Sequence, residues 1–238
     1  SVAHSYGDEL LDPDFQKIKT LTVGIPDEYF IPGIESEVRV GVEQAIEAIK
    51  GLGVRFKKIS LPHTKYALSA YYIIVPAEVS SNMARYDGIR YGPSDQQPAT
   101  SLQELYVKTR SEGLGAEVKR RILLGTFVLS SGYYDAYYAK AQKVRALVKR
   151  DFTEVFKDVD VILTPVSPTR AFKIGERAND PLAMYLADIF TIPVNLAGLP
   201  GISIPVKGMT GLPVGFQLIG KPFHEADILG IGQMYEKM

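Results

Sequence analysis

The first quarter of the chain alternates between short apolar runs and apolar residues at helical spacing. Leu21–Ile25 is an apolar run closed by Pro26, and Val54–Ile59 alternates apolar with basic residues, so both predict β-strands. Between them, apolar residues recur at helical spacing over residues 38–49, and Gly51 marks the end of that helix. The order strand, helix, strand predicts a βαβ unit with a parallel strand pair.

The rest of the chain predicts several helices followed by more strands. Apolar stripes with a period near 3.6 indicate helices, and short apolar runs bounded by Gly or Pro indicate strands. The expected helices are Tyr66–Arg85, Ser101–Arg110, Glu117–Leu129, Tyr134–Phe156 and one from Glu225 onward; the expected strands are Val159–Leu163, Gly201–Pro205 and Gly215–Ile219. This pattern predicts an α/β fold with a mixed sheet flanked by helices.

The stretch from Asp188 to Pro205 places one carboxylate and one amide in a long apolar run broken by proline and glycine. Proline cannot donate a hydrogen bond to a sheet, so Pro193, Pro200 and Pro205 exclude a plain central strand. We expect short extended pieces joined by turns. Backbone of this kind often lines a pocket.

Composition narrows the function classes. The chain has 238 residues, 46% hydrophobic and 23% charged, which suffices for a sizeable core, and one domain is the simplest organisation. The formal net charge is zero, so no overall field favours nucleic acid or a membrane. There is no cysteine, which excludes disulfides and thiol catalysis. The longest apolar stretch, around Tyr71–Val79, is too short to span a bilayer.

The histidines and the paired carboxylates are not spaced like catalytic residues or metal ligands. His4, His63 and His224 lack metal-like spacing, which favours surface or capping roles. Asp158 and Asp160 lie before and at the start of an apolar strand, so we expect them to serve the turn and the start of the strand rather than to form an acid–base pair. The sequence therefore predicts no metal ligand.

Arg121 is predicted to point along the apolar face of its helix. At 100° per residue, Leu114 and Val128 bracket it, and Val118 and Leu124 lie next to them. A guanidinium in that position requires an anionic partner, and its planar fork suits a carboxylate. The partner is either a core carboxylate, in a structural ion pair, or the carboxylate of a ligand.

Asp188 is an anionic residue that needs a compensating group, as Arg121 needs an anion. It lies near the end of a short helix that Asp180 is expected to cap and Pro181 to begin, among apolar residues such as Met184 and Phe190. A carboxylate at a helix C-terminus is opposed by the helix dipole, so another group must compensate it. Asp188 is therefore either a helix cap, the partner of a nearby lysine, or the partner of the ammonium of a ligand.

Long blocks of the sequence resemble a known family. TIPVNLAGLPGISIPV and LPVGFQLIGKPF are similar to the closing part of the amidase-signature family. YALSAYYIIVPAEVSSNMARYDGIRYG, TRSEGLGAEVKRRILLGTFVLSSGYYDAYYAKAQKVR and DVILTPVSPTRAFKIGE resemble in particular its glutamyl-tRNA(Gln) amidotransferase A subunits. The resemblance covers nearly the whole chain from Leu21 onward. It implies the amidase-signature α/β fold, of which residues 1–238 would be the C-terminal half of a single domain.

The resemblance also implies roles for three residues. Arg121 and Asp188 match the family's glutamine-holding arginine and aspartate, and Tyr72 matches a tyrosine lining the same pocket, although Tyr71 is adjacent and equally placed. An arginine for the α-carboxylate and an aspartate for the α-ammonium form a minimal clamp for zwitterionic glutamine. The clamp would orient the side-chain amide toward a nucleophile.

The family's nucleophile is expected elsewhere. Family members carry a GGSSGGS loop with two serines and an upstream lysine, and this sequence contains no such loop. Ser80–Ser81 has no glycine beside it and Ser130–Ser131 is followed by Gly132 alone. Neither pair has the run of glycines that would let backbone amides converge on an oxyanion, so we expect helix-end or surface serines there. The chain opens at Ser1 rather than Met, matching the interior of the family sequence. No catalytic residue is therefore assigned, and the chain alone is predicted inactive.

The family context implies partners and leaves alternatives open. The holoenzyme converts Glu-tRNA(Gln) to Gln-tRNA(Gln) with B and C subunits, uses ATP and magnesium through one of these partners, and works in the bacterial cytoplasm or an organelle. This chain would carry no cofactor and touch no membrane. One alternative is another amidase of the same family, against which RSEGLG and GYYDAYY argue. The other is a non-catalytic binding module.

Overall fold

The computed structural model describes residues 7, 10, 12–30, 32–92, 101–177 and 180–238. It divides into two compact units: a sheet unit of residues 1–68 and 145–238, and a helical unit of residues 69–144. Helices α3 and α6 each cross a boundary between these units. Each unit is described by itself below.

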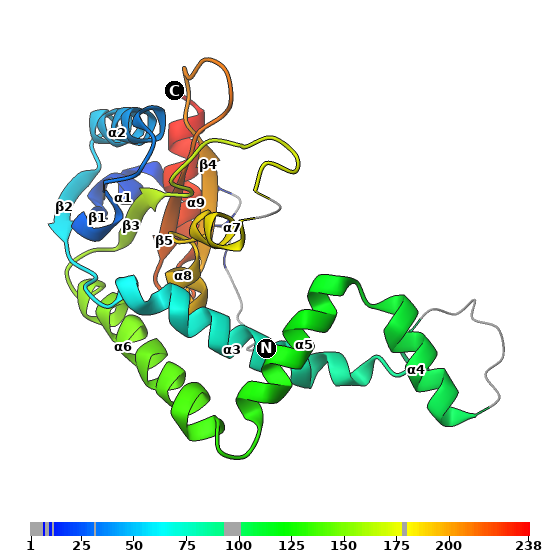
Figure 1. The fold of residues 1–238 in the computed structure, drawn as a ribbon. Coiled ribbons are helices and arrows are strands. Elements are labelled where there is room, and N and C mark those ends of the chain that lie inside the picture. The colour runs from blue at the N-terminus through cyan, green and yellow to red at the C-terminus, as the bar shows by residue number, and fades with distance from the viewer. Residues whose placement is uncertain (1–6, 8–9, 11, 31, 93–100, 178–179) are drawn as a thin grey trace. The chain divides into compact units, whose positions relative to one another are not determined.

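The sheet unit alternates strands and helices along the chain (Figure 1). Its elements are α1 (Phe15–Thr20), β1 (Thr22–Pro26), η2 (Asp27–Tyr29), α2 (Ser36–Gly51), β2 (Arg55–Ile59), η3 (Thr64–Tyr66), β3 (Val161–Pro165), α7 (Pro181–Leu186), α8 (Ile192–Ala197), β4 (Gly201–Pro205), β5 (Gly215–Gly220) and α9 (Glu225–Glu236). The helical unit contains η4 (Met83–Arg85), α4 (Leu102–Gly113), α5 (Ala116–Leu129), the π-helical segment η5 (Tyr134–Ala139), most of α3 (Ala67–Asn82) and the start of α6 (Lys140–Val155).

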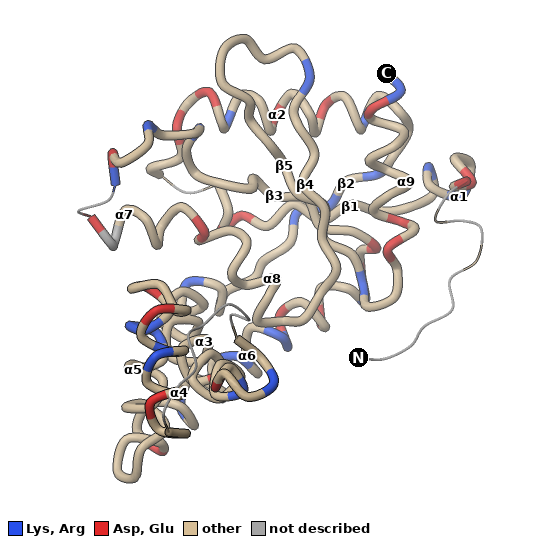
Figure 2. Tube along the Cα trace, turned by 90° about the vertical axis from the view of Figure 1, so that its right-hand side faces the viewer, with Lys and Arg blue, Asp and Glu red and all other residues tan. Residues whose placement is uncertain are grey.

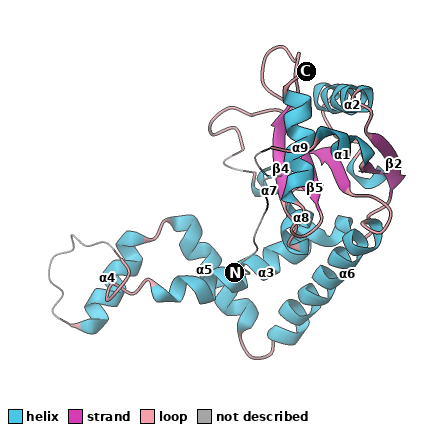
Figure 3. Cartoon of the chain, turned by 180° about the vertical axis from the view of Figure 1, so that it is seen from behind, coloured by secondary structure: helices cyan, strands magenta, loops and turns pink. Residues whose placement is uncertain are grey.

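The strands of the described residues form one mixed sheet in the order β2-β1-β3-β5-β4. β2 and β4 lie at its two edges (Figure 3). β1 runs parallel to β2 and β3, with Val23 opposite both Phe56 and Val161. β5 is antiparallel to β3 and β4, with Leu218 opposite Leu163 on one side and Ile202 on the other. The predicted α/β class, the mixed sheet and the parallel βαβ unit are confirmed.

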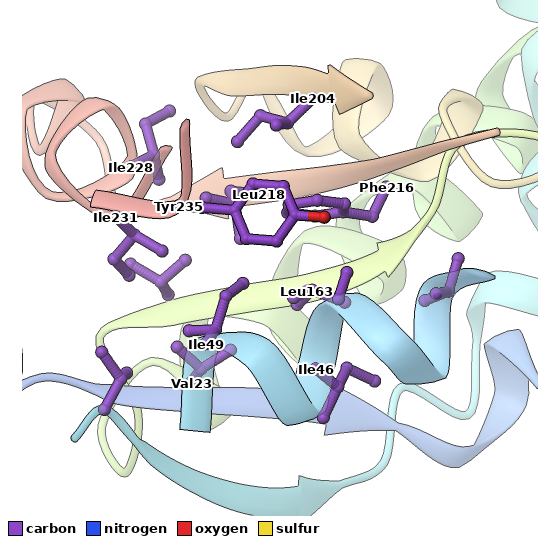
Figure 4. Packing of buried hydrophobic residues seen from close by; sticks show 14 of the residues in the cluster. Val23, Ile46, Ile49, Leu163, Ile204, Phe216, Leu218, Ile228, Ile231 and Tyr235 are labelled. Carbon is purple, nitrogen blue, oxygen red and sulfur yellow. The ribbon is translucent and has the colours of Figure 1, made fainter. Parts of the chain in front are cut away.

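The core lies between the sheet and helices α2 and α9. Alternate residues of each strand point toward these helices, as the two-residue period of a strand requires. Their side chains interlock in one cluster, including Val23, Ile46, Ile49, Leu163, Ile204, Phe216, Leu218, Ile228, Ile231 and Tyr235 (Figure 4). Charged residues of both signs occur mainly on the helices and loops around the strands, and the middle strands carry almost none (Figure 2).

The opposite face of the sheet is buried as well. Ile162 and Ile219 are fully buried, and Gln217 on the same face is hydrogen-bonded to the carbonyl oxygen of Phe190. The segment leading into α8 therefore lies on this face. Arg145 Nε of α6 donates to the carbonyl oxygen of Leu196, 2.9 Å away, so a cation meets the C-terminal end of α8.

The prediction of extended pieces throughout residues 188–205 is wrong for its middle part, which forms helix α8. Pro193 lies in the first turn, where its missing N–H breaks no helical hydrogen bond. Gly198 ends the helix in the left-handed conformation at φ 72°, and the N–H of Leu199 reaches back to the carbonyl of Val194. Proline and glycine here mark the two ends of a short helix. Strand β4 has the predicted bounds.

The long predicted helix over residues 134–156 is present, but its first part is π-helical. Segment η5 covers Tyr134–Ala139 and continues directly into α6. Tyrosines pair at four-residue spacing here: the ring centroids of Tyr134 and Tyr138 are 5.2 Å apart, and those of Tyr137 and the preceding N-cap residue Tyr133 are 6.1 Å apart. The spacing of hydrophobic residues in the sequence does not distinguish a π-helical segment from an α-helix.

Candidate functional site

Tyr72 and Arg121 lie on two helices of the helical unit that pack closely at a glycine. Tyr72 belongs to α3 and Arg121 to α5, and each lies one turn before the contact between Pro76 and Gly125. A Cβ atom at Gly125 would lie 1.9 Å from the carbonyl oxygen of Pro76. Residues one turn apart share a helix face, so this contact brings the predicted tyrosine and arginine into one neighbourhood.

Arg121 forms an ion pair, but not with a core carboxylate as the structural alternative predicted. Arg121 Nε donates to Glu117 Oε1 at 2.8 Å, and the two side chains are 29% and 51% exposed. The partner is thus an exposed carboxylate one turn earlier on the same helix, not a core carboxylate. The terminal nitrogens Nη1 and Nη2 of Arg121 have no hydrogen-bond partner among the described residues. The end of the fork is available to a ligand.

Electrostatic effects link Arg121 to both neighbouring tyrosines. The pKa of Arg121 is raised, chiefly by its hydrogen bond to Glu117, and the phenols of Tyr71 and Tyr72 contribute in the same direction. The two phenol rings meet edge to face, with centroids 5.3 Å apart. Correspondingly, the hydrogen bond from Arg121 lowers the pKa of Glu117 below its ordinary value. Both tyrosines therefore lie near the arginine, and the choice between them stays open.

Asp188 lies in the turn between α7 and α8, and its side chain is exposed. Of its apolar neighbours in sequence, Met184 and Leu186 are 44% and 40% exposed, whereas Phe190 is buried. The carbonyl oxygen of Asp188 accepts the backbone N–H groups of Thr191 and Ile192, each at 3.1 Å, at the start of α8. Its carboxylate has no hydrogen bond or ion pair to any residue that the structure describes.

The start of the preceding helix is as predicted. Asp180 Oδ1 accepts the backbone N–H of Ala183 at 3.0 Å, and Pro181 occupies the first turn of α7. The helix ends at Leu186, so Asp188 lies just beyond its C-terminal cap.

A buried glutamine that the sequence did not reveal, Gln217, forms hydrogen bonds to the backbone close to Asp188. Gln217 on β5 is 6% exposed, and its Nε2 donates to the carbonyl oxygens of Phe190 at 2.9 Å and Pro165 at 3.2 Å. The ring of Phe190 stacks on Tyr29 with centroids 5.3 Å apart. A single amide within the apolar strand FQLIG is the signal that could have found it, because a buried amide requires partners.

The three predicted ligand-binding residues are therefore divided between the units. Tyr72 and Arg121 share the helical unit, where helix packing sets their relative position. Asp188 belongs to the sheet unit, where α7, α8 and Gln217 define its turn.

The paired carboxylates have the structural roles expected of them. Asp160 precedes β3, and its carboxylate accepts the N–H of Thr22 at 3.0 Å and the Lys221 ammonium at 2.9 Å. Partial burial raises the pKa of Asp160, but these two hydrogen bonds outweigh it and hold the pKa below its ordinary value. Asp158 pairs with Lys57 at 2.8 Å on the surface. Both carboxylates connect strand ends.

The histidines are engaged with aspartates. His63 Nδ1 lies 2.8 Å from Asp151 Oδ1, and the His63 backbone N–H donates to the other oxygen of this carboxylate at 2.7 Å. His224 precedes α9, and its Nδ1 lies 3.0 Å from Asp227 Oδ2. His4 lies outside the described residues. The first of these pairs ties α6 to the segment before α3.

The paired serines serve helix ends. Ser80 Oγ and Ser81 Oγ donate to the carbonyl oxygen of Ala77 within the last turns of α3, at 2.9 and 3.2 Å. Ser130 follows α5 and donates to the carbonyl oxygen of Phe127 at 2.7 Å. These local bonds match the predicted helix-end roles.

Metal-binding clusters and membrane-spanning helices are both absent from the residues described. In that part of the chain, no three or more His, Cys, Asp or Glu side chains are arranged to hold a metal ion. No helix among those described is both long and apolar enough to cross a membrane.

The chain belongs to the amidase family, whose family model matches residues 6–229. An amidase structure of 21% identity has the same fold over 92% of this chain and 45% of that one, with a TM-score of 0.67. Its identity is too low to indicate more than the fold.

Curated relatives within the family are closer. In Carboxydothermus hydrogenoformans, the A subunit of glutamyl-tRNA(Gln) amidotransferase is 57% identical over 222 residues, which is 93% of this chain and 46% of the relative. That of Syntrophus aciditrophicus is 59% identical over 92% of this chain and 45% of its own length. The crystal structure of the same protein from Thermotoga maritima is 42% identical, with a TM-score of 0.68 over 91% of this chain and 42% of that one. The chain thus spans a little under half the length of these relatives.

Proposed function

We propose that the chain is the glutamine-binding part of a glutamyl-tRNA(Gln) amidotransferase A subunit. The observation that carries the proposal is the identity of 57% to a protein of that name over 93% of the chain. The match covers 222 of the 238 residues.

Arg121 is proposed to bind the α-carboxylate of glutamine. Only its Nε is engaged by Glu117, so two terminal nitrogens can bind both oxygens of a carboxylate. Tyr72, or its neighbour Tyr71, lines the same pocket on the facing helix.

Asp188 is proposed to bind the α-ammonium of glutamine. Its exposed carboxylate has no protein cation beside it among the described residues, and its turn is held by backbone hydrogen bonds at the start of α8. The opposite charges of Arg121 and Asp188 match the zwitterion. The glutamine amide would then face a nucleophilic serine supplied outside residues 1–238.

The remaining parts of the proposal concern the complete enzyme. Hydrolysis of glutamine would supply ammonia to a B subunit, which uses ATP and magnesium to amidate Glu-tRNA(Gln), with a C subunit holding the other two together. We propose no cofactor on this chain and a cytoplasmic location.

The first test uses alternative nitrogen donors in the complete amidotransferase. Arg121→Lys and Asp188→Asn should each raise the KM for glutamine by about 10-fold to 100-fold, the loss expected for one hydrogen bond to a charged group. Amidation supported by ammonium should stay near the unchanged level because that step needs no glutamine. Lys119→Gln, on the same helix as Arg121, is the matched control.

Comparing glutamine with ammonium as the nitrogen donor also shows whether Arg121 and Asp188 have a purely structural role. Equal losses with glutamine and with ammonium would mean that these residues hold the fold together, and the glutamine clamp would be refuted.

The second test concerns the chain on its own. Purified residues 1–238 should release no ammonia from glutamine, because residual binding groups offer no covalent route. Steady release that disappears in Ser80→Ala or Ser130→Ala would overturn the assignment of the nucleophile to another segment. A non-catalytic binding module would bind glutamine but would not restore turnover when the rest of the amidase domain is added.

A further inference from the structure

A cavity in the sheet unit combines apolar walls with one arginine. Its volume is about 370 Å³, and it lies beside α7 and the loop that follows β3. The walls are mainly apolar, with Pro32, Pro168, Leu186 and Ile189 among them. Two polar residues, Thr169 and Arg177, are among those that line it. The cavity is of the size that small-molecule sites have in proteins.

Arg177 is held in place by neutral groups. Its Nη1 donates to the carbonyl oxygen of Ala183 at 3.3 Å, and its Nη2 donates to Thr169 Oγ1 at 3.1 Å. The ring of Phe172 covers one face of the guanidinium, with 4.1 Å between Cζ and the ring centroid. These contacts fix the orientation of the side chain and leave its charge without compensation.

No carboxylate within the described ranges pairs with Arg177. The acidic groups nearest in sequence are engaged elsewhere: Glu176 accepts the Lys173 backbone N–H at 2.8 Å, and Asp180 caps α7. The neighbouring Arg170 shows the contrast, because it pairs with Glu35 and Glu37 at 3.1 Å each. A half-buried cation on an apolar cavity favours an anion as its partner.

We propose that this cavity binds a small apolar monocarboxylate, with the carboxylate on Arg177 and the hydrocarbon chain between Pro168 and Ile189. Thr169 Oγ1 accepts from Arg177, so its own O–H can donate to the ligand. A single guanidinium and one hydroxyl suit a carboxylate better than a phosphate, which has more oxygens to satisfy. The apolar walls favour a hydrocarbon tail over a second charge.

The residues that line the cavity include none of the residues proposed to hold glutamine. Tyr72 and Arg121 belong to the helical unit, and Asp188 is not among the residues lining the cavity. A failure of either proposal therefore leaves the other standing.

The experiment is a titration of the ¹⁵N-labelled chain with hexanoate, followed by the amide NMR signals of Leu186 and Ile189. Hexanoate should bind saturably at one site. Hexanamide, which has the same shape without the charge, and inorganic phosphate, which has charge without a tail, should each bind at least about tenfold more weakly. Hexanamide or phosphate binding as well as hexanoate, or no saturable binding by hexanoate, would overturn the proposal.

Three variants test whether hexanoate binding depends on the charge of Arg177 and on the cavity. Arg177→Gln should weaken hexanoate by about 10-fold to 100-fold and leave hexanamide unchanged. Lys173→Gln removes a cation from the same loop and should have no effect. Ala183→Leu keeps Arg177, fills the cavity, and should abolish hexanoate binding. The amide spectrum shows whether each variant is folded, and unchanged hexanoate affinity in folded Arg177→Gln or folded Ala183→Leu would refute the site.

Discussion

Gly125 should be the position in the helical unit that least tolerates a methyl group. In Gly125→Ala the new Cβ would lie 1.9 Å from the Pro76 carbonyl oxygen, 2.5 Å from the Pro76 carbonyl carbon and 2.8 Å from Ser80 Cβ. Real Cβ atoms essentially never approach closer than 3.0 Å, so α3 and α5 must separate by more than an ångström. The obstacle is helix backbone, which cannot swing aside as the end of a flexible side chain can.

The magnitude follows from two opposed effects. Overpacking costs about 1–3 kcal/mol, and a clash with backbone places this site at the upper end of that range. Alanine gains about 1 kcal/mol over glycine in a helix interior. The net loss of unfolding free energy should therefore be about 2 kcal/mol.

The control is Gly51→Ala at the end of α2, where a Cβ would meet nothing within 4 Å. It makes the same change in backbone freedom without a clash, so it should be neutral or stabilising by up to about 1 kcal/mol. Urea unfolding gives the free energies of both variants. Hydrogen exchange of α3 and α5 shows whether the loss is confined to the helical unit.

A stable variant would refute the packing argument. If Gly125→Ala matched Gly51→Ala in stability and kept full exchange protection in α3 and α5, the two helices could not pack as closely as described. In the complete enzyme, separation of these helices should also displace Arg121 from Tyr72 and raise the KM for glutamine.

Two further predictions concern the sheet unit. The pKa of Asp160 is lowered in the folded state, so the stability that this carboxylate adds is complete above its unfolded-state pKa, near 3.9, and is lost as the pH falls below that value toward the folded pKa. Asp160→Asn should flatten this acid limb in urea unfolding between about pH 2 and about pH 5, and an unchanged limb would contradict the role of the Lys221 and Thr22 bonds. Gly198 has φ 72°, and a Cβ atom there would meet nothing within 4 Å, so backbone strain alone opposes a side chain at this position. Gly198→Ala should therefore lower the free energy of unfolding by about 1–2 kcal/mol, measured by thermal melting. Equal stability of the variant would show that α8 can end in another way.

The sequence alone determined those features whose causes are local. Residues 38–49 carry their apolar positions on one helix face, and a strand precedes and follows them, so the parallel βαβ unit could be predicted from period and stop signals. The cap of α7 by Asp180 and the bounds of β4 have the same local origin. Long similar blocks also sufficed to indicate the family, because the order of many residues is far more specific than any one motif.

Only the tertiary structure decided which groups meet. Period places Arg121 on an apolar face, but it does not tell that Glu117, one turn earlier, engages its Nε and leaves the terminal nitrogens open. Asp188 has apolar neighbours in sequence, and the turn between α7 and α8 exposes it all the same. Gln217 fastens Phe190 from a strand that is distant in sequence. Burial and partner choice depend on contacts between distant segments, and a one-dimensional pattern specifies which groups need a partner without specifying which partner they find.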